Sequence, residues 1–478
     1  MKYEPVIGLE VHLHLNTKTK AFCGCSTQFG SEPNAQVCPV CLGFPGSLPV
    51  YNQTALDYAI KVALALNCKV QEHTKFDRKN YFYPDLPKNY QISQYDLPLS
   101  MHGFLDIELG GQEKRIGITR VHMEEDAGKL IHQEDCSLVD FNRTGIPLLE
   151  IVSEPDLNSP EEAYEYLSTL KSVIEYLDVS DCDMEKGSLR CDANISLRPA
   201  GSKTLGVKTE LKNMNSFKGV KDALAFEIGR QNKLLESAET LLQETRLWNA
   251  KSSETLPMRV KEGAKDYRYF PEPDLPALII TESKIAEIKN TIPELPKEKM
   301  RRFIKDYGLS EYDAKVLTAS KWTARFSEET MRKFSAVNKK PVANWIIGPL
   351  AGIAGNKSCE ISALRISADQ LVDLIELVEK KQVISNLTGK VVLEEMANTG
   401  KHPQKIIEEK NLAQISDSTS LNSVIAGVIK ENPKSVADYK TGKANALMFL
   451  VGQAMRKSAG KANPKMLQTL LKERLDSE

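Results

Sequence analysis

Three short, strand-like stretches carry polar side chains at two-residue spacing: Glu10-Val-His12, Asp192-Ala-Asn194 and Glu210-Leu-Lys212. In a β-strand, residues i and i+2 project from the same face, so the central Val11, Ala193 and Leu211 are expected in a core. The polar pairs then share the opposite surface. A single pair is equally typical of the solvated face of an antiparallel sheet. Three pairs together favour one acidic wall that holds a metal.

Further carboxylates lie in two other strand-like segments. One segment ends in three successive acids, Glu124, Glu125 and Asp126. In an extended chain Glu124 and Asp126 share one face and Glu125 takes the other, so only a subset can enter one site. Glu150 is flanked by leucine, isoleucine and valine, which makes a solvated position implausible. A carboxylate in such a run is expected to be paired or bound to metal.

Four cysteines form two close pairs, Cys23-Gly-Cys25 and, twelve residues later, Cys38-Pro-Val-Cys41. Tetrahedral zinc takes four thiolates, and two such pairs can converge on it in a small ribbon. Four protein sulfurs leave no open position, so the zinc is expected to be structural; the alternative is four unmetallated thiols. The chain has nine cysteines, an odd number that argues against a disulfide framework. The remaining five are expected to be core or incidental residues: Cys68, Cys136, Cys182, Cys191 and Cys359.

Basic and aromatic residues alternate around two prolines in the segment 77–94, which predicts an ordered loop. Arg78 and Lys79 could neutralise phosphate oxygens, and Tyr81 or Tyr83 could stack on a base or ribose. The alternative is that these aromatic side chains pack beneath a long loop.

The overall charge does not point to a nucleic-acid or membrane partner, because 63 basic and 64 acidic residues nearly cancel. We find no apolar signal-peptide core and no stretch approaching the ~18 apolar residues of a membrane span, so we expect a cytoplasmic protein. The sequence also lacks a GxxxxGK[ST] phosphate loop, a strand-linked GxGxxG, a GxSxG elbow and a glycine- and serine-rich amidase stretch. If the protein uses ATP, carboxylate-held Mg²⁺ with nearby Lys and Arg must bind the phosphates.

The pattern of elements predicts an α+β protein with three domains. A large domain over 1–293 has a mainly antiparallel sheet, and two small all-helical domains follow over 294–405 and 406–478. In the first domain, strands are expected at 5–15, 115–123, 189–198 and 206–212, and helices at 54–66, 160–177 and 216–236.

The last block is locally basic, with ten Lys or Arg against five Asp or Glu from Leu421 onward. The residues predicted to contact a phosphate backbone cluster around turns: Lys440, Lys443, Arg456, Lys457, Lys461 and Lys465. The alternative is a solvated helical face.

Six motifs resemble the B-subunit family of the bacterial aspartyl/glutamyl-tRNA(Asn/Gln) amidotransferases. They are Gly8–His12, the paired cysteines, Asp77–Lys88, Gly187–Asn194, Glu210–Phe217 and Asp266–Asp274. The similarity extends over essentially the whole chain. It implies a ligase that uses ATP and Mg²⁺ to phosphorylate the side-chain carboxylate of Glu on tRNA(Gln) or of Asp on tRNA(Asn), after which ammonia displaces the phosphate.

The resemblance also implies partners and a fold. Glutamine would be hydrolysed in a separate A subunit, with ammonia passing through an internal tunnel, and a small C subunit would complete a heterotrimer. The first domain would be a cradle similar to the catalytic core of glutamine synthetase, and the third a tail domain that holds the tRNA.

With this chemistry, the candidate site residues take four roles. Candidate Mg²⁺ ligands are Glu10, His12, Glu125 (or its neighbour Glu124), Glu150, Asp192 and Glu210. Candidates for phosphate or acyl-phosphate charge are Lys79, Arg143, Arg190 and Lys212, and candidates for positioning are Asn194, Asn213, Asn215 and Ser216. Arg78, Tyr81 and Tyr83 are the candidate nucleotide contacts. Two other functions stay open: a noncatalytic tRNA-binding scaffold, and a stand-alone ligase acting on free glutamate.

Overall fold

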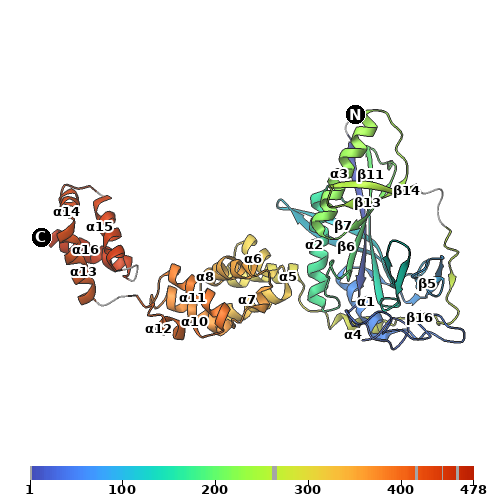
Figure 1. Ribbon diagram of the computed structural model, residues 1–478, viewed down its shortest axis with the longest axis horizontal. Coiled ribbons are helices and arrows are strands. Elements are labelled where there is room, and N and C mark those ends of the chain that lie inside the picture. Colours follow the sequence, from blue (N-terminus) through green and yellow to red (C-terminus); the bar gives the residue numbers. More distant parts are fainter. Residues whose placement is uncertain (1–2, 261–265, 415–417, 444, 459–461, 478) are drawn as a thin grey trace. The chain divides into compact units, whose positions relative to one another are not determined.

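The computed structural model describes residues 3–260, 266–414, 418–443, 445–458 and 462–477. The chain divides into two compact units, Met1–Leu295 and Pro296–Glu478. The first unit contains a large sheet with helices, and the second is helical (Figure 1). The mixed fold with an antiparallel sheet that the sequence predicts is confirmed. None of the described helices is long and apolar enough to cross a membrane.

Within the described residues, the first unit is built on a nine-stranded sheet with the order β14-β13-β12-β11-β1-β10-β7-β6-β2. Its strands are β1 (Tyr3–His14), β2 (Lys69–Val70), β6 (Ser100–Leu109), β7 (Gln112–Glu125), β10 (Pro147–Ser153), β11 (Leu189–Pro199), β12 (Thr209–Met214), β13 (Glu244–Asn249) and β14 (Glu254–Val260). Neighbouring strands run antiparallel except for β12 and β13, which are parallel.

Three helices pack on one face of this sheet: α1 (Gln53–Ala65), α2 (Pro160–Leu177) and α3 (Phe217–Glu236). Figure 1 shows α2 and α3 running along the strands. The helices cover the apolar face, where Val11 is 1% exposed and Ala193 and Leu211 are fully buried. The predicted separation of apolar and polar faces is therefore confirmed at these three positions.

The segment 77–94, predicted as a loop, contains two short strands, β4 (Asp77–Asn80) and β5 (Tyr90–Ser93). They form a small sheet with β15 (Phe270–Pro271), in which Phe270 pairs with Arg78. The loop prediction is thus wrong at both ends of the segment, because the prolines confine the irregular chain to its middle. Two smaller sheets join β16 (Leu278–Ile279) to β3 (His73–Thr74) and β8 (Lys129–His132) to β9 (Ser137–Asp140).

Six of the seven elements predicted for the first domain differ from the observed bounds, by one to three residues at an end. The strand expected at 206–212 begins at Thr209, and the helix expected from Ser216 begins at Phe217 because the Ser216 side chain caps it. The helix α4 (Glu282–Lys289), which contacts α1, is not among the elements that the sequence predicts.

The second unit is helical in its described part. Its elements are α5 (Pro296–Tyr307), α6 (Glu311–Thr318), α7 (Lys321–Lys333), α8 (Lys340–Trp345), the π-helical turn η1 (Ile346–Leu350), α9 (Ala351–Asn356), the 3₁₀ turn η2 (Ile361–Ala363), α10 (Ala368–Glu379), α11 (Asn386–Thr399), α12 (Pro403–Glu409), α13 (Ser418–Glu431), α14 (Pro433–Lys440), α15 (Asn445–Lys457) and α16 (Pro464–Ser477). Its buried apolar side chains form two clusters, one between Phe303 and Ile407 and one between Leu421 and Leu475. The three-domain division itself stays a prediction.

Candidate functional site

The sheet register brings the predicted polar pairs together on the face opposite the helices. In β1, Glu10 pairs with Asp192 of β11 and His12 pairs with Glu150 of β10. On β11, Asn194 pairs with Glu210 of β12. The polar positions of four adjacent strands therefore form one continuous surface.

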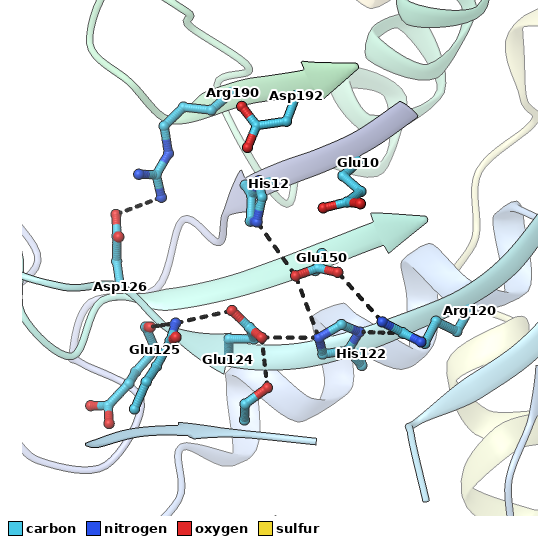
Figure 2. A network of polar contacts seen from close by, with 12 residues as sticks. Glu10, His12, Arg120, His122, Glu124, Glu125, Asp126, Glu150, Arg190 and Asp192 are labelled. Carbon is cyan, nitrogen blue, oxygen red and sulfur yellow. Dashed lines mark hydrogen bonds and ion pairs between the residues drawn. The ribbon is translucent and has the colours of Figure 1, made fainter. Parts of the chain in front are cut away.

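Three polar side chains, from β1, β7 and β10, come close enough to hold one metal ion. One ligand atom each from His12, Glu124 and Glu150 lies within 4.8 Å of the others. His12 Nε2 is 3.4 Å from Glu150 Oε2, and Figure 2 shows the two side chains pointing toward each other from neighbouring strands. We call these three residues the carboxylate–histidine group.

Two residues that the sequence analysis did not select complete the surroundings of this group. His122 Nε2 lies 3.0 Å from Glu124 Oε1 and 3.7 Å from Glu150 Oε2. Arg120 Nη2 is 3.8 Å from Glu150 Oε1, and its Nε donates a 3.3 Å hydrogen bond to His122 Nδ1. The signal was present, since Arg120, His122 and Glu124 repeat the same two-residue spacing along β7.

The electrostatic environment keeps both carboxylates of the group ionised. Burial alone would raise the pKa of Glu124, but the Lys79 charge and the contacts with His122 and Ser93 hold that pKa well below its ordinary value. Glu150 has a lowered pKa because His122 and His12 outweigh its burial. Burial likewise opposes the charge of Lys79, yet Glu124 and other neighbouring groups raise its pKa.

Glu125, the preferred candidate ligand, lies elsewhere. Its Oε1 accepts a 2.9 Å hydrogen bond from the backbone N–H of Ile92 and pairs with Lys88. Figure 2 shows its side chain directed away from His12 and Glu150. Glu125 and Lys88 instead line a cavity of about 210 Å³ that reaches the paired cysteines. Between the two adjacent acids, the structure brings Glu124 into the carboxylate–histidine group.

The other predicted ligands form a second cluster farther along the strands. Asn194 Nδ2 donates a 2.9 Å hydrogen bond to Glu10 Oε1. Lys212 contacts Asp192 and lies 3.0 Å from Glu210 Oε1, so its ammonium sits between two carboxylates. Asn194 Oδ1 is buried without a hydrogen-bond partner among the described residues. An unsatisfied buried oxygen beside three acids is consistent with oxygen coordination of Mg²⁺.

Asp126 organises a third cluster, which the sequence analysis also missed. Its Oδ2 lies 2.6 Å from His14 Nε2, 2.9 Å from Arg190 Nη2 and 3.5 Å from Arg143 Nε. Burial would raise the pKa of Asp126, but Arg190, His14 and Arg143 hold it well below its usual range. Two candidate phosphate-binding arginines are therefore positioned by one buried carboxylate.

The candidate nucleotide contacts have different surroundings. Arg78 makes two 2.8 Å hydrogen bonds to Glu272 and lies 4.3 Å from the ring centroid of Tyr90, so it joins β4 to the segment after β15. Tyr81 packs edge-on against Tyr267, at 5.9 Å between ring centroids. Tyr83 is 51% exposed.

The candidate positioning residues after Lys212 form the junction between β12 and α3. Asn213 has a φ of 67°, and its Nδ2 donates a 3.1 Å hydrogen bond to the Trp248 carbonyl. Asn215 is exposed. Ser216 Oγ accepts a 2.9 Å hydrogen bond from the Gly219 N–H and so caps α3.

The paired cysteines converge as the sequence predicts. One sulfur each from Cys23, Cys25, Cys38 and Cys41 lies within 4.8 Å of the others. The surrounding chain consists of turns with one isolated bridge, between Thr19 and Ser26, where a ribbon was expected. The hydrogen bond from Cys23, with the Cys38 N–H and the Lys20 charge, lowers the pKa of Cys41 to about 4 despite burial. Four thiols with a stabilised thiolate fit a structural zinc.

The remaining cysteines and the tail residues are placed as follows. Cys68, Cys182 and Cys191 are buried, Cys359 is half-buried and Cys136 is exposed. The exposed tail residues are Lys440, Lys443, Arg456, Lys457 and Lys465. Lys443 and Lys457 form ion pairs with Asp438 and Glu431. Lys461 lies outside the described residues.

The fold and these clusters define a class: an α+β protein with a metal-competent carboxylate–histidine site on the open face of an antiparallel sheet. Residues 5–286 match the family model described as the GatB/GatE catalytic domain, and residues 325–475 match the model described as the GatB domain. The chain belongs to the GatB/GatE family, as the sequence motifs predict.

Curated relatives span the same length as this chain, and each is the B subunit of an aspartyl/glutamyl-tRNA(Asn/Gln) amidotransferase. The chain is 57% identical to the protein of Caldanaerobacter subterraneus subsp. tengcongensis, over 99% of this chain and 100% of the relative. It is 55% identical to the protein of Carboxydothermus hydrogenoformans, over 99% of each chain. The corresponding protein of Clostridium tetani is 51% identical, over 100% of this chain and 99% of the relative.

Proposed function

We propose that this chain is the kinase and transamidase subunit of a tRNA-dependent amidotransferase. It phosphorylates the side-chain carboxylate of Glu on tRNA(Gln), of Asp on tRNA(Asn), or of both, with ATP and Mg²⁺, and then amidates the acyl phosphate. The names of the relatives support the tRNA substrates. The observation that carries the chemistry is the carboxylate–histidine group beside the half-buried Lys79.

The reaction has two steps. A carboxylate oxygen of the aminoacyl group attacks the γ-phosphorus of ATP, forming the acyl phosphate and releasing ADP. Ammonia then attacks the acyl carbon, and phosphate leaves with the electrons of the carbon–oxygen bond. When bound, Mg²⁺ would offset the negative charge of the phosphate oxygens.

The side chains of this protein align the reactants and stabilise charge. Glu124, Glu150 and His12 would hold one cation, and the Glu10, Asp192 and Glu210 carboxylates offer oxygen ligands for a second position. Lys79 and Lys212 lie beside these acids, where an ammonium can contact phosphate oxygens. Arg143 and Arg190, held by Asp126, are positioned to stabilise the developing negative charge.

Two other features enter this proposal. The four cysteines would hold a structural zinc, which would join the two cysteine pairs of the chain segment before α1. Because the sequence lacks an amidase stretch, we propose that a glutaminase A subunit supplies ammonia and that a small C subunit completes the complex. The naming of the relatives as B subunits is consistent with such an assembly. The proposed first domain is a cradle similar to glutamine synthetase, and the proposed site of action is the cytoplasm.

Glu150→Gln tests the chemistry in the assembled complex. It removes one ligand charge while keeping the shape of the side chain, so we expect the Mg²⁺ concentration for half-maximal activity to rise by roughly tenfold or more. Glu113→Gln is the matched control, because Glu113 is an exposed acid on β7, the strand that carries Glu124. The readout is ATP hydrolysis stimulated by Glu-tRNA, together with the formation of Gln-tRNA.

Three outcomes would contradict the proposal. Normal ATP-dependent phosphorylation of Glu-tRNA by the folded Glu150→Gln variant would remove the carboxylate–histidine group from the chemistry. Stimulation of ATP hydrolysis by free glutamate alone would indicate a stand-alone ligase. Absence of ATP hydrolysis by the wild-type complex with charged tRNA would indicate a noncatalytic scaffold.

A further inference from the structure

A fully buried lysine lies against the paired cysteines. Lys20 is 0% exposed, and its Nζ lies 3.7 Å from Cys41 Sγ and 3.3 Å from the Phe141 carbonyl oxygen. Its backbone N–H donates a 3.0 Å hydrogen bond to the Cys25 carbonyl. Lys20 therefore contacts both cysteine pairs, one through its side chain and the other through its main chain.

The charge of a four-thiolate metal centre explains why an ammonium lies there. Four thiolates around a divalent ion leave a net charge of about −2. Taking such a charge out of water is costly unless a cation or hydrogen-bond donors compensate it. Burying the ammonium group of a lysine is also unfavourable unless it has a hydrogen-bond acceptor. An N–H···S contact between an ammonium and a thiolate stabilises both groups.

The same lysine also links the cysteines to the candidate site on the sheet. Its Nζ reaches the carbonyl of Phe141, and the next residue, Ala21, donates a 2.7 Å backbone hydrogen bond to the Gly145 carbonyl. Gly145 in turn donates to the Asp126 carbonyl at 2.9 Å. The segment 141–146 carries Arg143, so this short path joins the metal centre to the Asp126 cluster.

We propose that Lys20 is the buried counter-cation of the four-cysteine centre, and that it raises the affinity of the centre for Zn²⁺. This role rests on the zinc binding proposed above. Lys20 is a positioning residue of the metal site and not a ligand. Its ammonium donates to the Cys41 thiolate and to the Phe141 carbonyl, and so it connects the Cys41 sulfur to the segment 141–146.

The experiment measures the Zn²⁺ dissociation constant of the full chain by competition with a chromogenic chelator. Lys20→Met keeps an unbranched side chain, one atom shorter, and removes the charge, and we expect it to weaken Zn²⁺ binding by roughly ten- to hundredfold. Lys20→Arg keeps the charge and should restore most of the affinity. Lys18→Met is the matched control, because Lys18 is exposed on the same segment, and it should leave the affinity unchanged.

A double-mutant cycle separates this role from simple packing. In a Cys41→Ser background the acceptor sulfur is absent, so Lys20→Met should have little further effect on Zn²⁺ affinity. Should Lys20→Met not fold, Lys20→Gln provides a second neutral variant. Melting of the zinc-loaded and metal-free forms gives an independent readout, because loss of a counter-cation destabilises the loaded form more.

The outcomes are distinguishable. Wild-type chain that binds no Zn²⁺ would overturn the zinc proposal itself. Wild-type chain that binds Zn²⁺, with neutral variants of equal affinity, would overturn the role of Lys20 alone. Equal weakening by Lys20→Arg and Lys20→Met, equal destabilisation of the loaded and metal-free forms, or an undiminished effect in the Cys41→Ser background would also overturn it.

Discussion

At the scale of single residues, His12 decides how the carboxylate–histidine group behaves without metal. Burial would lower its pKa, but the hydrogen bond with Glu150 and the charges of Glu150 and Glu124 raise it above 6.5, against an opposing effect of Arg190. When it is protonated, the imidazole is the cation between these two carboxylates. A metal ion has to displace this proton to use the ring nitrogen as a ligand.

This arrangement predicts a pH dependence of stability in Mg²⁺-free buffer. A raised folded-state pKa contributes stability that is fully present below about pH 6.5 and is lost as the pH rises through the folded pKa. One group changes the unfolding free energy by at most about 1.4 kcal/mol per pH unit. Thermal unfolding of wild type and His12→Gln across pH 6–9 should therefore converge as the pH rises.

The exposed His73 offers the control for this measurement. His73→Gln should follow the wild-type pH profile throughout. A difference between wild type and His12→Gln that stays constant from pH 6 to 9 would contradict the role of His12.

Over the same range, added Mg²⁺ should bind more tightly as the pH rises, because protons compete for the ring nitrogen.

The residue scale also shows what two-residue spacing can predict. It placed Val11, Ala193 and Leu211 in the core because the side-chain period of a strand is fixed. It could not choose between Glu124 and Glu125, since that choice depends on how the end of β7 pairs with β10, where Leu148 lies opposite Glu124. Nor could it find the partners of Asp126, because Arg143 and Arg190 reach it from other strands and loops.

At the scale of elements, the junction of β12 and α3 contains four candidate residues that are close in the sequence: Lys212, Asn213, Asn215 and Ser216. Asn213 takes a left-handed conformation, which asparagine tolerates better than most residues. This conformation lies near the end of β12, where the register against β11 shifts, and Ser216 then caps the first turn of α3. Capping explains Ser216 without contact to substrate, so its predicted positioning role can be tested separately from its structural one.

Ser216→Ala should lower the free energy of unfolding by about 0.5–2 kcal/mol, because a backbone N–H at the start of α3 loses its acceptor. Ser216→Asp keeps a capping oxygen and should retain most of the stability. Chemical unfolding of both variants, with amidation rates in the complex, distinguishes the two roles. If Ser216→Asp is as stable as wild type but loses amidation, the residue also positions substrate; if Ser216→Ala is as stable as wild type, the cap is unimportant.

Elements with strong local signals could be predicted, and elements made by tertiary contacts could not. The helix α2 matches its predicted bounds because Ser159 and Pro160 mark its start and a regular apolar stripe follows. The short strand β15 was missed because it pairs with the distant strand β4, next to the Arg78–Glu272 hydrogen bond that spans 194 positions. The strand β4 was missed because it forms through its pairing with both β5 and β15. Proline usually ends or kinks a helix, yet the π-helical turn η1 accommodates Pro349 between α8 and α9.

At the scale of the whole molecule, charge is distributed unevenly along a nearly neutral chain. The buried apolar side chains between Leu421 and Leu475 form their own cluster, which leaves the basic residues of α14 to α16 at the surface. Lys443 and Lys457 pair with acids, but exposed ion pairs contribute little and can exchange for phosphate. A phosphate backbone would release counterions on binding here, so salt dependence is the property to measure.

Neutralising three of these cations to glutamine should weaken tRNA binding and reduce its salt dependence. The variant changes Lys440, Arg456 and Lys465. Each lost phosphate contact reduces the magnitude of the slope of log affinity against log salt by about 0.7–0.9. For three contacts, we expect this slope to fall in magnitude by up to about 2–3. We also expect the KM for tRNA to rise roughly tenfold or more. The matched control changes three exposed lysines that lie earlier in the second unit: Lys305, Lys381 and Lys390. Glutaminase activity of the complex should be unchanged in both variants, because neither variant changes a residue of the first unit. An equal rise in KM in both variants would indicate general charge attraction, and an unchanged KM and salt slope in the tail variant would show that these residues form only a solvated surface.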